Sequence, residues 1–223
     1  MKALYAIIKK DLRLEWRTRA RLSALLFFSL ASLLMFSFAL GPEIKIMRAN
    51  AGGYLWLALF FASVLALSES FRVEGENRAL ETVLTSPTDA RAIYLGKALA
   101  NAVLLLLLAV ILVPVMLALY DVNVSELSLG RLALVLTLGS FAVAAPGTLV
   151  AAISTNAKSK DLLLPVLLFP LLVPVLLGAV KATGLALNGD PMGDGGTWLT
   201  LLVAFNVVYW PLGFVLFPSV VEE

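Results

Sequence analysis

The stretch that decides the fold is ALANAVLLLLLAVILVPVMLALY, residues 98–120, which contains no Asp, Glu, Lys or Arg. A helix of about 20 apolar residues is long enough to cross the hydrocarbon core of a bilayer, which is roughly 30 Å thick. The apolar residues here are continuous instead of alternating with polar ones, and the run is about twice as long as a strand of a transmembrane barrel. The stretch therefore predicts a transmembrane α-helix.

Five further stretches of the 223-residue chain have the same character. Of its residues 61% are hydrophobic and 14% are charged, whereas about a quarter of the residues of a soluble domain are charged. We therefore predict an all-α, polytopic membrane protein with one domain, residues 22–221, embedded in the lipid bilayer. Its six transmembrane helices are expected at about residues 22–42, 49–68, 98–120, 132–157, 162–180 and 198–220.

The segment before the first span, residues 1–21, predicts an amphipathic helix lying along the inner membrane surface. Its apolar residues Leu4, Ile8, Leu12 and Trp16 are spaced four apart, among seven Lys and Arg residues. Such a helix can act as a topology anchor, or as an elbow that packs against neighbouring spans or a partner.

The distribution of positive charge predicts the orientation. With six spans, the segments on the side of the two termini carry 13 of the 17 Lys and Arg residues. By the positive-inside rule both termini are cytoplasmic, and the connection at residues 69–97 also faces the cytosol. The net charge of +2 is scattered over several loops, so nothing indicates binding to nucleic acid.

Several kinds of chemistry are excluded by what the chain lacks. It has no His and no Cys, which removes the usual metal ligands, thiolate nucleophiles and imidazole bases. It also lacks the glycine-rich loop that cradles nucleotide phosphates. We predict no catalytic residue and no metal site, so ATP would have to be hydrolysed by a partner. No ionisable residue falls inside a predicted span, which argues against ion-coupled transport.

The charged connection at residues 69–97 contains a candidate docking helix, NRALETVL, at residues 77–84. A helix of about two turns needs a surface to pack against. Its apolar face would comprise Leu80, Val83 and Leu84, with Arg78 and Glu81 on the polar side. The alternative is a helix resting on lipid headgroups, which five acidic and four basic residues in the connection disfavour.

A helix start follows at SPTD. We expect Ser86 as the N-cap, Pro87 at the first helical position and Asp89 completing a capping box. The next helix would then begin at Pro87 and continue into the third span.

Three groups of residues within the spans are candidates for more than lipid contact. Pro165, Pro170 and Pro174 predict a bent or broken fifth span, either as part of a gated pathway or as ordinary proline kinks that neighbouring helices repair. Asn206, Tyr209 and Trp210 would meet either a ligand or a neighbouring helix. Close helix packing is expected in the fourth span, which contains Gly139, Ser140, Pro146, Gly147, Thr148 and Ser154.

Several stretches of the sequence resemble the CcmB family, the membrane subunit of the haem exporter of cytochrome c maturation. They are FALGPE (38–43), GYLWLALFFASVLALSESF (53–71), LETVLTSP (80–87), YLGK (94–97) and LLFPLLVPVLLGA (167–179). A Phe-x-x-Asp pattern of the family falls on Phe71 and Glu74, where the acid is one methylene longer. The chain departs from the family at Asn77-Arg78, where an Asp-Gly pair is expected, and at its acidic last residues, Glu222-Glu223.

The resemblance implies the permease of an ABC-type exporter in the cytoplasmic (inner) membrane. It implies a second copy of this chain, a CcmA-type ATPase that binds ATP, CcmC- and CcmD-type membrane proteins and a CcmE-type haem chaperone. Residues 71–84 would dock the ATPase. Haem is a candidate substrate and not a resident cofactor, and the transported species stays open. The alternatives are an exporter of another substrate, such as a lipid or a drug, and a non-transporting scaffold for haem-handling proteins.

Haem iron is held in proteins by His, Cys, Met or Tyr. Near the outer face this chain offers Met47, Tyr54, Tyr120 and Met192. Since these residue types are also common in packing and at membrane interfaces, we expect a partner to supply axial histidines.

Overall fold

Six long helices make up the protein. The computed structural model describes residues 19–40, 43–76, 89–123, 127–155 and 160–221, and contains no strand among them. All six helices are long and apolar enough to cross a membrane, which confirms the predicted all-α fold with six spans. The interfacial helix predicted at residues 1–21 lies outside the described residues, apart from Arg19–Arg21. The helices are α2 (Arg19–Leu40), α3 (Ile44–Glu76), α5 (Ala90–Leu119), α6 (Leu129–Thr155), α7 (Lys160–Asn188) and α8 (Gly195–Val221).

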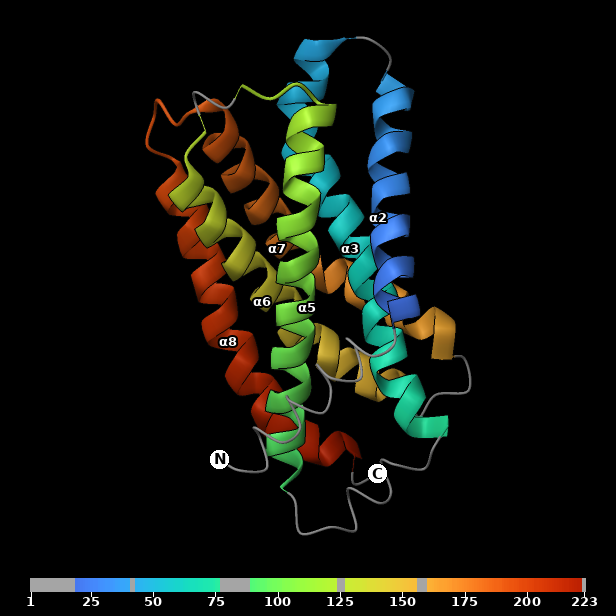
Figure 1. Cartoon of the computed structure of the whole chain (residues 1–223). Coiled ribbons are helices and arrows are strands. Elements are labelled where there is room, and N and C mark those ends of the chain that lie inside the picture. Colours follow the sequence, from blue (N-terminus) through green and yellow to red (C-terminus); the bar gives the residue numbers. More distant parts are fainter. Residues whose placement is uncertain (1–18, 41–42, 77–88, 124–126, 156–159, 222–223) are drawn as a thin grey trace.

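Successive helices run in opposite directions through one bundle (Figure 1). Helices α3 and α6 end, and α5 and α7 begin, at one end, called the lower end after its place in Figure 1. Helices α2, α5 and α7 end, and α3, α6 and α8 begin, at the upper end. Helix α2 begins and α8 finishes at the lower end, as an even number of spans requires.

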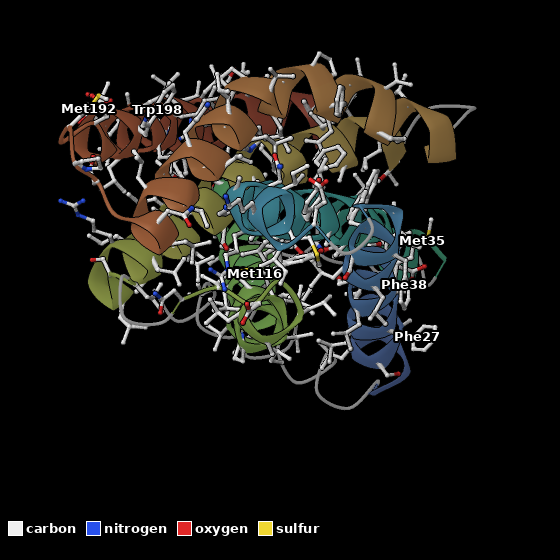
Figure 2. The ribbon with its side chains drawn as sticks, turned by 90° about the horizontal axis from the view of Figure 1, so that it is seen from above. Phe27, Met35, Phe38, Met116, Met192 and Trp198 are labelled. Atoms are coloured by element: carbon white, nitrogen blue, oxygen red, sulfur yellow. The ribbon has the colours of Figure 1, made fainter. Side chains whose placement is uncertain are left out.

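Helix α6 is the centre of the bundle. It packs against α3, α5, α7 and α8, and 72% of its spanning residues are buried, compared with 17% for α2 and 11% for α8. The outer face of α2 carries the exposed side chains of Phe27, Met35 and Phe38, whereas Met116 of α5 lies in the interior (Figure 2). Large exposed apolar side chains on the rim are expected for a bundle whose solvent is lipid.

Small residues let α6 approach α3 closely. A Cβ atom at Gly139 would lie 2.1 Å from Trp56 Cη2, and one at Gly147 would lie 2.5 Å from Leu67 Cδ1. Both distances are shorter than real contacts, so a side chain at either position would force a shift, which the rigid Trp56 ring resists more than the flexible end of Leu67 does. The other members of the predicted packing set in α6 are buried as well. The prediction of close helix packing is therefore confirmed.

The helix ends differ from the sequence-based boundaries. Helix α3 continues to Glu76 and α5 starts at Ala90, so both ends of the connection predicted at residues 69–97 are helical. The prediction followed the limits of the charge-free runs. A helix can continue past such a limit because long charged side chains reach the membrane interface while the backbone stays hydrogen-bonded.

The predicted start of the third spanning helix is also wrong. Asp89 has a non-helical ψ of 126° and is itself the N-cap, because its side chain accepts a hydrogen bond of 2.9 Å from the Arg91 N–H. It therefore does not complete a capping box begun by Ser86. Ser86 and Pro87 lie outside the described residues. An aspartate accepting from the second helical N–H is a favourable cap, which explains why the helix begins here.

The three prolines of the fifth span do not break it. Helix α7 is continuous over 29 residues, with Pro165, Pro170 and Pro174 inside it. The fifth span is therefore not broken, and a bend at the prolines stays a prediction. Pro170 and Pro174 are exposed on the outside of the bundle and Pro165 is half-buried, so Pro170 and Pro174 do not line an interior pathway of this single chain.

Candidate functional site

Three polar side chains on the lower half of α5 face the interior of the bundle. Tyr94, Lys97 and Asn101 are spaced three and four residues apart, which places them on one face of the helix. Their exposed fractions are 0%, 2% and 4%. Buried polar groups in a membrane protein are costly unless they are hydrogen-bonded, so their partners identify what this face does. We call these three residues the polar ladder.

Each residue of the polar ladder bonds to a neighbouring helix. Lys97 Nζ donates to the backbone carbonyl of Ser70 on α3 at 3.0 Å. The Tyr94 hydroxyl donates to the carbonyl of Ala145 on α6 at 3.2 Å. Asn101 Nδ2 donates to Thr148 Oγ1, also on α6, at 3.1 Å. About two turns of α5 are thereby fixed to both α3 and α6.

Helix α8 packs against the same part of α5. A Cβ atom at Gly213 would lie 2.0 Å from the Tyr94 hydroxyl oxygen, so the two helices touch at this point. The Tyr94 ring is 5.5 Å from that of Phe217 and 6.4 Å from that of Trp210. The guanidinium carbon of Arg91 lies 5.5 Å from the centre of the Phe214 ring. The first turns of α5 are thus in contact with α8 as well.

Lys97 corrects the expectation that no ionisable residue lies inside a span. It lies seven positions after Ala90, the first residue of α5, which is about 10 Å along the helix axis. The expectation placed Lys97 at the edge of a loop because it is the last charged residue before residues 98–120. A buried lysine in a membrane helix faces the bundle interior and marks a functional position more often than a surface lysine does.

The polar ladder lies beside the segment that was predicted to dock an ATPase. Ser70, which accepts from Lys97, is one turn before Glu74 on α3, and Tyr94 is one turn after Ala90 on α5. Phe71 and Glu74 belong to the last turns of α3. The remaining predicted docking and cap residues, Arg78, Leu80, Glu81, Val83, Leu84, Ser86 and Pro87, lie outside the described residues. Lys97 therefore joins α3 and α5, the two helices on either side of this segment.

The polar residues of α8 contact α6 and each other. Asn206 Nδ2 donates to the carbonyl of Leu138 on α6 at 3.0 Å and to that of Leu202 at 2.9 Å. Trp210 Nε1 donates to Asn206 Oδ1 at 3.1 Å. The Tyr209 ring stacks on Phe205, with ring centres 4.0 Å apart. Of the two interpretations of these residues, contact with a neighbouring helix is the one that Asn206 and Trp210 display.

The four candidate haem ligands do not converge on one point. Tyr54 and Tyr120 have ring centres 5.7 Å apart, but the Tyr120 hydroxyl donates to the carbonyl of Leu33 at 2.9 Å. Met47 is buried, whereas Met192 is 85% exposed between α7 and α8 (Figure 2). The described residues also contain no group of three His, Asp or Glu that could hold a metal ion.

The polar ladder was not among the residues predicted from the sequence to carry function. Tyr94 and Lys97 were noted only within the YLGK stretch, and Asn101 was assigned to an apolar span. The signal that was available is their spacing, because polar residues recurring every three or four positions next to an apolar run indicate a polar stripe on a helix.

The chain is similar along its whole length to proteins of one family. The family model described as CcmB protein matches residues 2–222. Heme exporter protein B of Bradyrhizobium diazoefficiens is 30% identical over 213 residues, which are 96% of this chain and 94% of that protein. The Pseudomonas aeruginosa protein of the same name is 28% identical over 92% of this chain and 91% of its own. Heme exporter protein B of Rhodobacter capsulatus is 32% identical over 82% of this chain and 85% of its own.

Proposed function

This chain belongs to the CcmB protein family, and from that membership we propose that it is the membrane subunit of a haem exporter whose work is driven by a partner ATPase. Relatives named heme exporter protein B, which match most of the chain, support the haem exporter part of the proposal. ATP would have to be hydrolysed by a partner, because the sequence has no phosphate-binding loop of its own.

The observation that carries the proposal is the bond between Lys97 Nζ and the Ser70 carbonyl. It joins the last turns of α3 to the first turns of α5, and these are the two helices that flank residues 77–88. A force applied to the segment between them would reach both helices together. Through Tyr94 and Asn101 it would also reach α6, the centre of the bundle.

The proposed cycle begins at residues 77–84. ATP binding brings two partner ATPase subunits together, and the docking helix follows the subunit on which its apolar face is seated. Helices α3 and α5 move as one unit because of the polar ladder, and α6 and α8 follow through their contacts with α5. The result is haem export or release of a haem-loaded chaperone on the opposite side of the membrane.

The proposal includes an orientation and an assembly. Both termini face the cytoplasm, because 13 of the 17 Lys and Arg residues lie on their side. The membrane is the cytoplasmic one. A second copy of the chain, CcmC- and CcmD-type membrane proteins and a CcmE-type chaperone complete the complex that the family membership implies.

The docking step is tested by replacing the apolar face of residues 77–84. The double variant Leu80→Asp/Leu84→Asp is expected to lose co-purification of the ATPase while it still inserts into the membrane, since a charged face cannot enter an apolar groove. The control Thr82→Asp/Thr85→Asp places the same two carboxylates on the opposite side of the predicted helix, the side of Arg78, with Thr85 directly after its last residue. Equal ATPase binding by the two variants would refute the assignment of this face.

The alternatives give different results in the assembled complex. An exporter of a lipid or a drug would show ATPase activity that responds to that compound and not to haem or haem-loaded chaperone. A scaffold would still support cytochrome c maturation when ATP hydrolysis by the partner is blocked. The proposal requires both haem-dependent ATPase activity and loss of maturation.

A further inference from the structure

The upper end of the bundle contains a groove between two helices that has no role in the proposed cycle. It has a volume of about 610 Å³ and lies between the first turns of α3 and the last turns of α7, which pack against each other. Figure 2 looks onto this end of the molecule. The volume falls in the range of small-molecule sites, roughly 300–1,000 Å³. The groove is at the opposite end from the polar ladder.

The walls of the groove are cationic. Lys45 and Arg48 on α3 and Lys181 on α7 line it, and no acidic residue does. Arg48 forms an ion pair with Asp121, and its Nε–H has no hydrogen-bond acceptor within the described ranges. Lys45 and Lys181 are exposed, and neither forms an ion pair with a described residue. Two lysines from different helices, neither ion-paired among the described residues, therefore line one cavity.

The other polar side chains of the groove do not neutralise its lysines. Asn50 and Asn188 also line the groove, but each amide donates to a carbonyl one turn earlier in its own helix, at 2.9 Å and 3.1 Å. Neither asparagine offers a negative charge. The field in the groove is thus that of the lysines, and it favours an oxyanion, either phosphate or carboxylate.

The rest of the groove is suited to an apolar body. Gly52, Gly53, Val180 and Leu185 line it, and a Cβ atom at Gly184 would have nothing within 4 Å. On the same face of α7, Leu177 lies one turn below Lys181 and is 50% exposed, and Val173 beneath it is 47% exposed. A cationic rim above exposed apolar surface is complementary to an amphiphile with an acidic head.

We infer that this groove is a binding site for an anionic amphiphile, with its phosphate or carboxylate held between Lys45 and Lys181 and its apolar part along α7. Two sources share this chemistry: the headgroup of an acidic phospholipid, and the propionates of haem. The lining offers no His, Cys, Met or Tyr, so haem would be held through its carboxylates and not through its iron.

The test uses the full chain purified in detergent. Binding of phosphatidylglycerol, of phosphatidylcholine as a neutral lipid, and of haem is measured for the unmodified protein and for Lys45→Gln/Lys181→Gln. We expect affinity for the anionic ligand to fall at least about tenfold, since each lysine near an anionic headgroup contributes about 1 kcal/mol. Phosphatidylcholine binding should not change. Because both lysines are exposed, raising the salt concentration should weaken binding of the unmodified protein as well.

Matched variants separate the site from total charge and from folding. Lys158→Gln/Lys160→Gln makes the same chemical change at two lysines that do not line the groove and should leave binding intact. Lys45→Arg/Lys181→Arg keeps the charges and should retain it. Melting temperatures of all variants verify the fold.

The ligand whose affinity falls identifies the source. A loss confined to phosphatidylglycerol supports a lipid site and a loss confined to haem supports a propionate site. Parallel losses support one site that accepts either. Only the haem outcome rests on the proposed function, because lipid binding needs no partner. Unchanged affinity for both anions in Lys45→Gln/Lys181→Gln would overturn the inference.

Discussion

The ammonium group of Lys97 on α5 donates a hydrogen bond of 3.0 Å to the backbone carbonyl of Ser70 on α3. This bond crosses between the two helices that enter and leave residues 77–88, about 10 Å inside α5. A lysine in this position is buried to 98%, and the free energy cost of its desolvation must be offset by its bonds.

Replacing Lys97 should affect the coupling to the partner ATPase more than the stability of the chain. Lys97→Met keeps the length and removes the charge, so we expect the melting temperature of the purified chain to change little, because a buried charge and its bonds are lost together. Haem-dependent activity of the partner ATPase should decrease, because the hydrogen bond between α3 and α5 is lost while their packing remains. Lys97→Glu puts a carboxylate against a carbonyl and should destabilise the protein by about 3–5 kcal/mol. Full ATPase stimulation in Lys97→Met would show that this bond does not couple the helices.

Gly139 is predicted to tolerate no side chain. In Gly139→Ala the new Cβ would lie 2.1 Å from Trp56 Cη2, and overpacking of this kind costs about 1–3 kcal/mol. The control is Gly130→Ala in the first turn of the same helix, where nothing lies within 4 Å and alanine should be neutral or slightly stabilising. Thermal unfolding in detergent measures both. Equal melting temperatures would mean that α3 and α6 are further apart than described.

Asn206 is predicted to stabilise the contact between α6 and α8. Asn206→Leu removes the bond to the Leu138 carbonyl and leaves Trp210 Nε1 without its acceptor. Interhelical hydrogen bonds in membranes contribute about 0.6 kcal/mol on average and up to about 1.7 kcal/mol, so we expect a loss of about 1 kcal/mol. Tyr209→Phe keeps the ring that stacks on Phe205 and should have no effect. If Asn206→Leu abolished export at an unchanged melting temperature, a ligand contact would be indicated instead.

The orientation can be tested without background labelling, because the chain has no cysteine. Met192→Cys, at a position that is 85% exposed at the upper end, should react with a membrane-impermeant maleimide in intact cells whose outer membrane admits the reagent. Thr88→Cys, in the α3–α5 connection, should react only after the cytoplasmic membrane is permeabilised. The reverse pattern would place the predicted docking helix outside the cell and refute ATPase coupling at that segment.

The six spans could be predicted from the sequence because the criterion is simple. Lipid offers no hydrogen bonds to the backbone, so a run of about 20 apolar residues must form a helix. The helix ends could not be predicted in the same way. Glu69 and Lys97 are charged and yet lie within α3 and α5, because the end of an apolar run limits lipid contact and does not end the helical hydrogen bonding.

The sites depend on which helix faces meet, and the sequence does not contain that information directly. The spacing of Tyr94, Lys97 and Asn101 shows only that they share a face. Their role depends on hydrogen bonds to Ser70, Ala145 and Thr148. The packing of α3 and α6 against α5 places these three acceptors beside the polar ladder. The cationic groove is a similar case, since Lys45 and Lys181 belong to helices that are distant in sequence.

The two halves of α5 are held in unlike ways. From Tyr94 to Asn101 the attachments are directional hydrogen bonds, whereas from Leu104 to Met116 the buried side chains are aliphatic or thioether groups. Dispersion contacts change little in energy when surfaces slide by a fraction of an ångström, while hydrogen bonds weaken quickly when they are misaligned. A force at its lower end would therefore tilt α5 about the segment from Tyr94 to Asn101, with a larger displacement along the aliphatic segment from Leu104 to Met116.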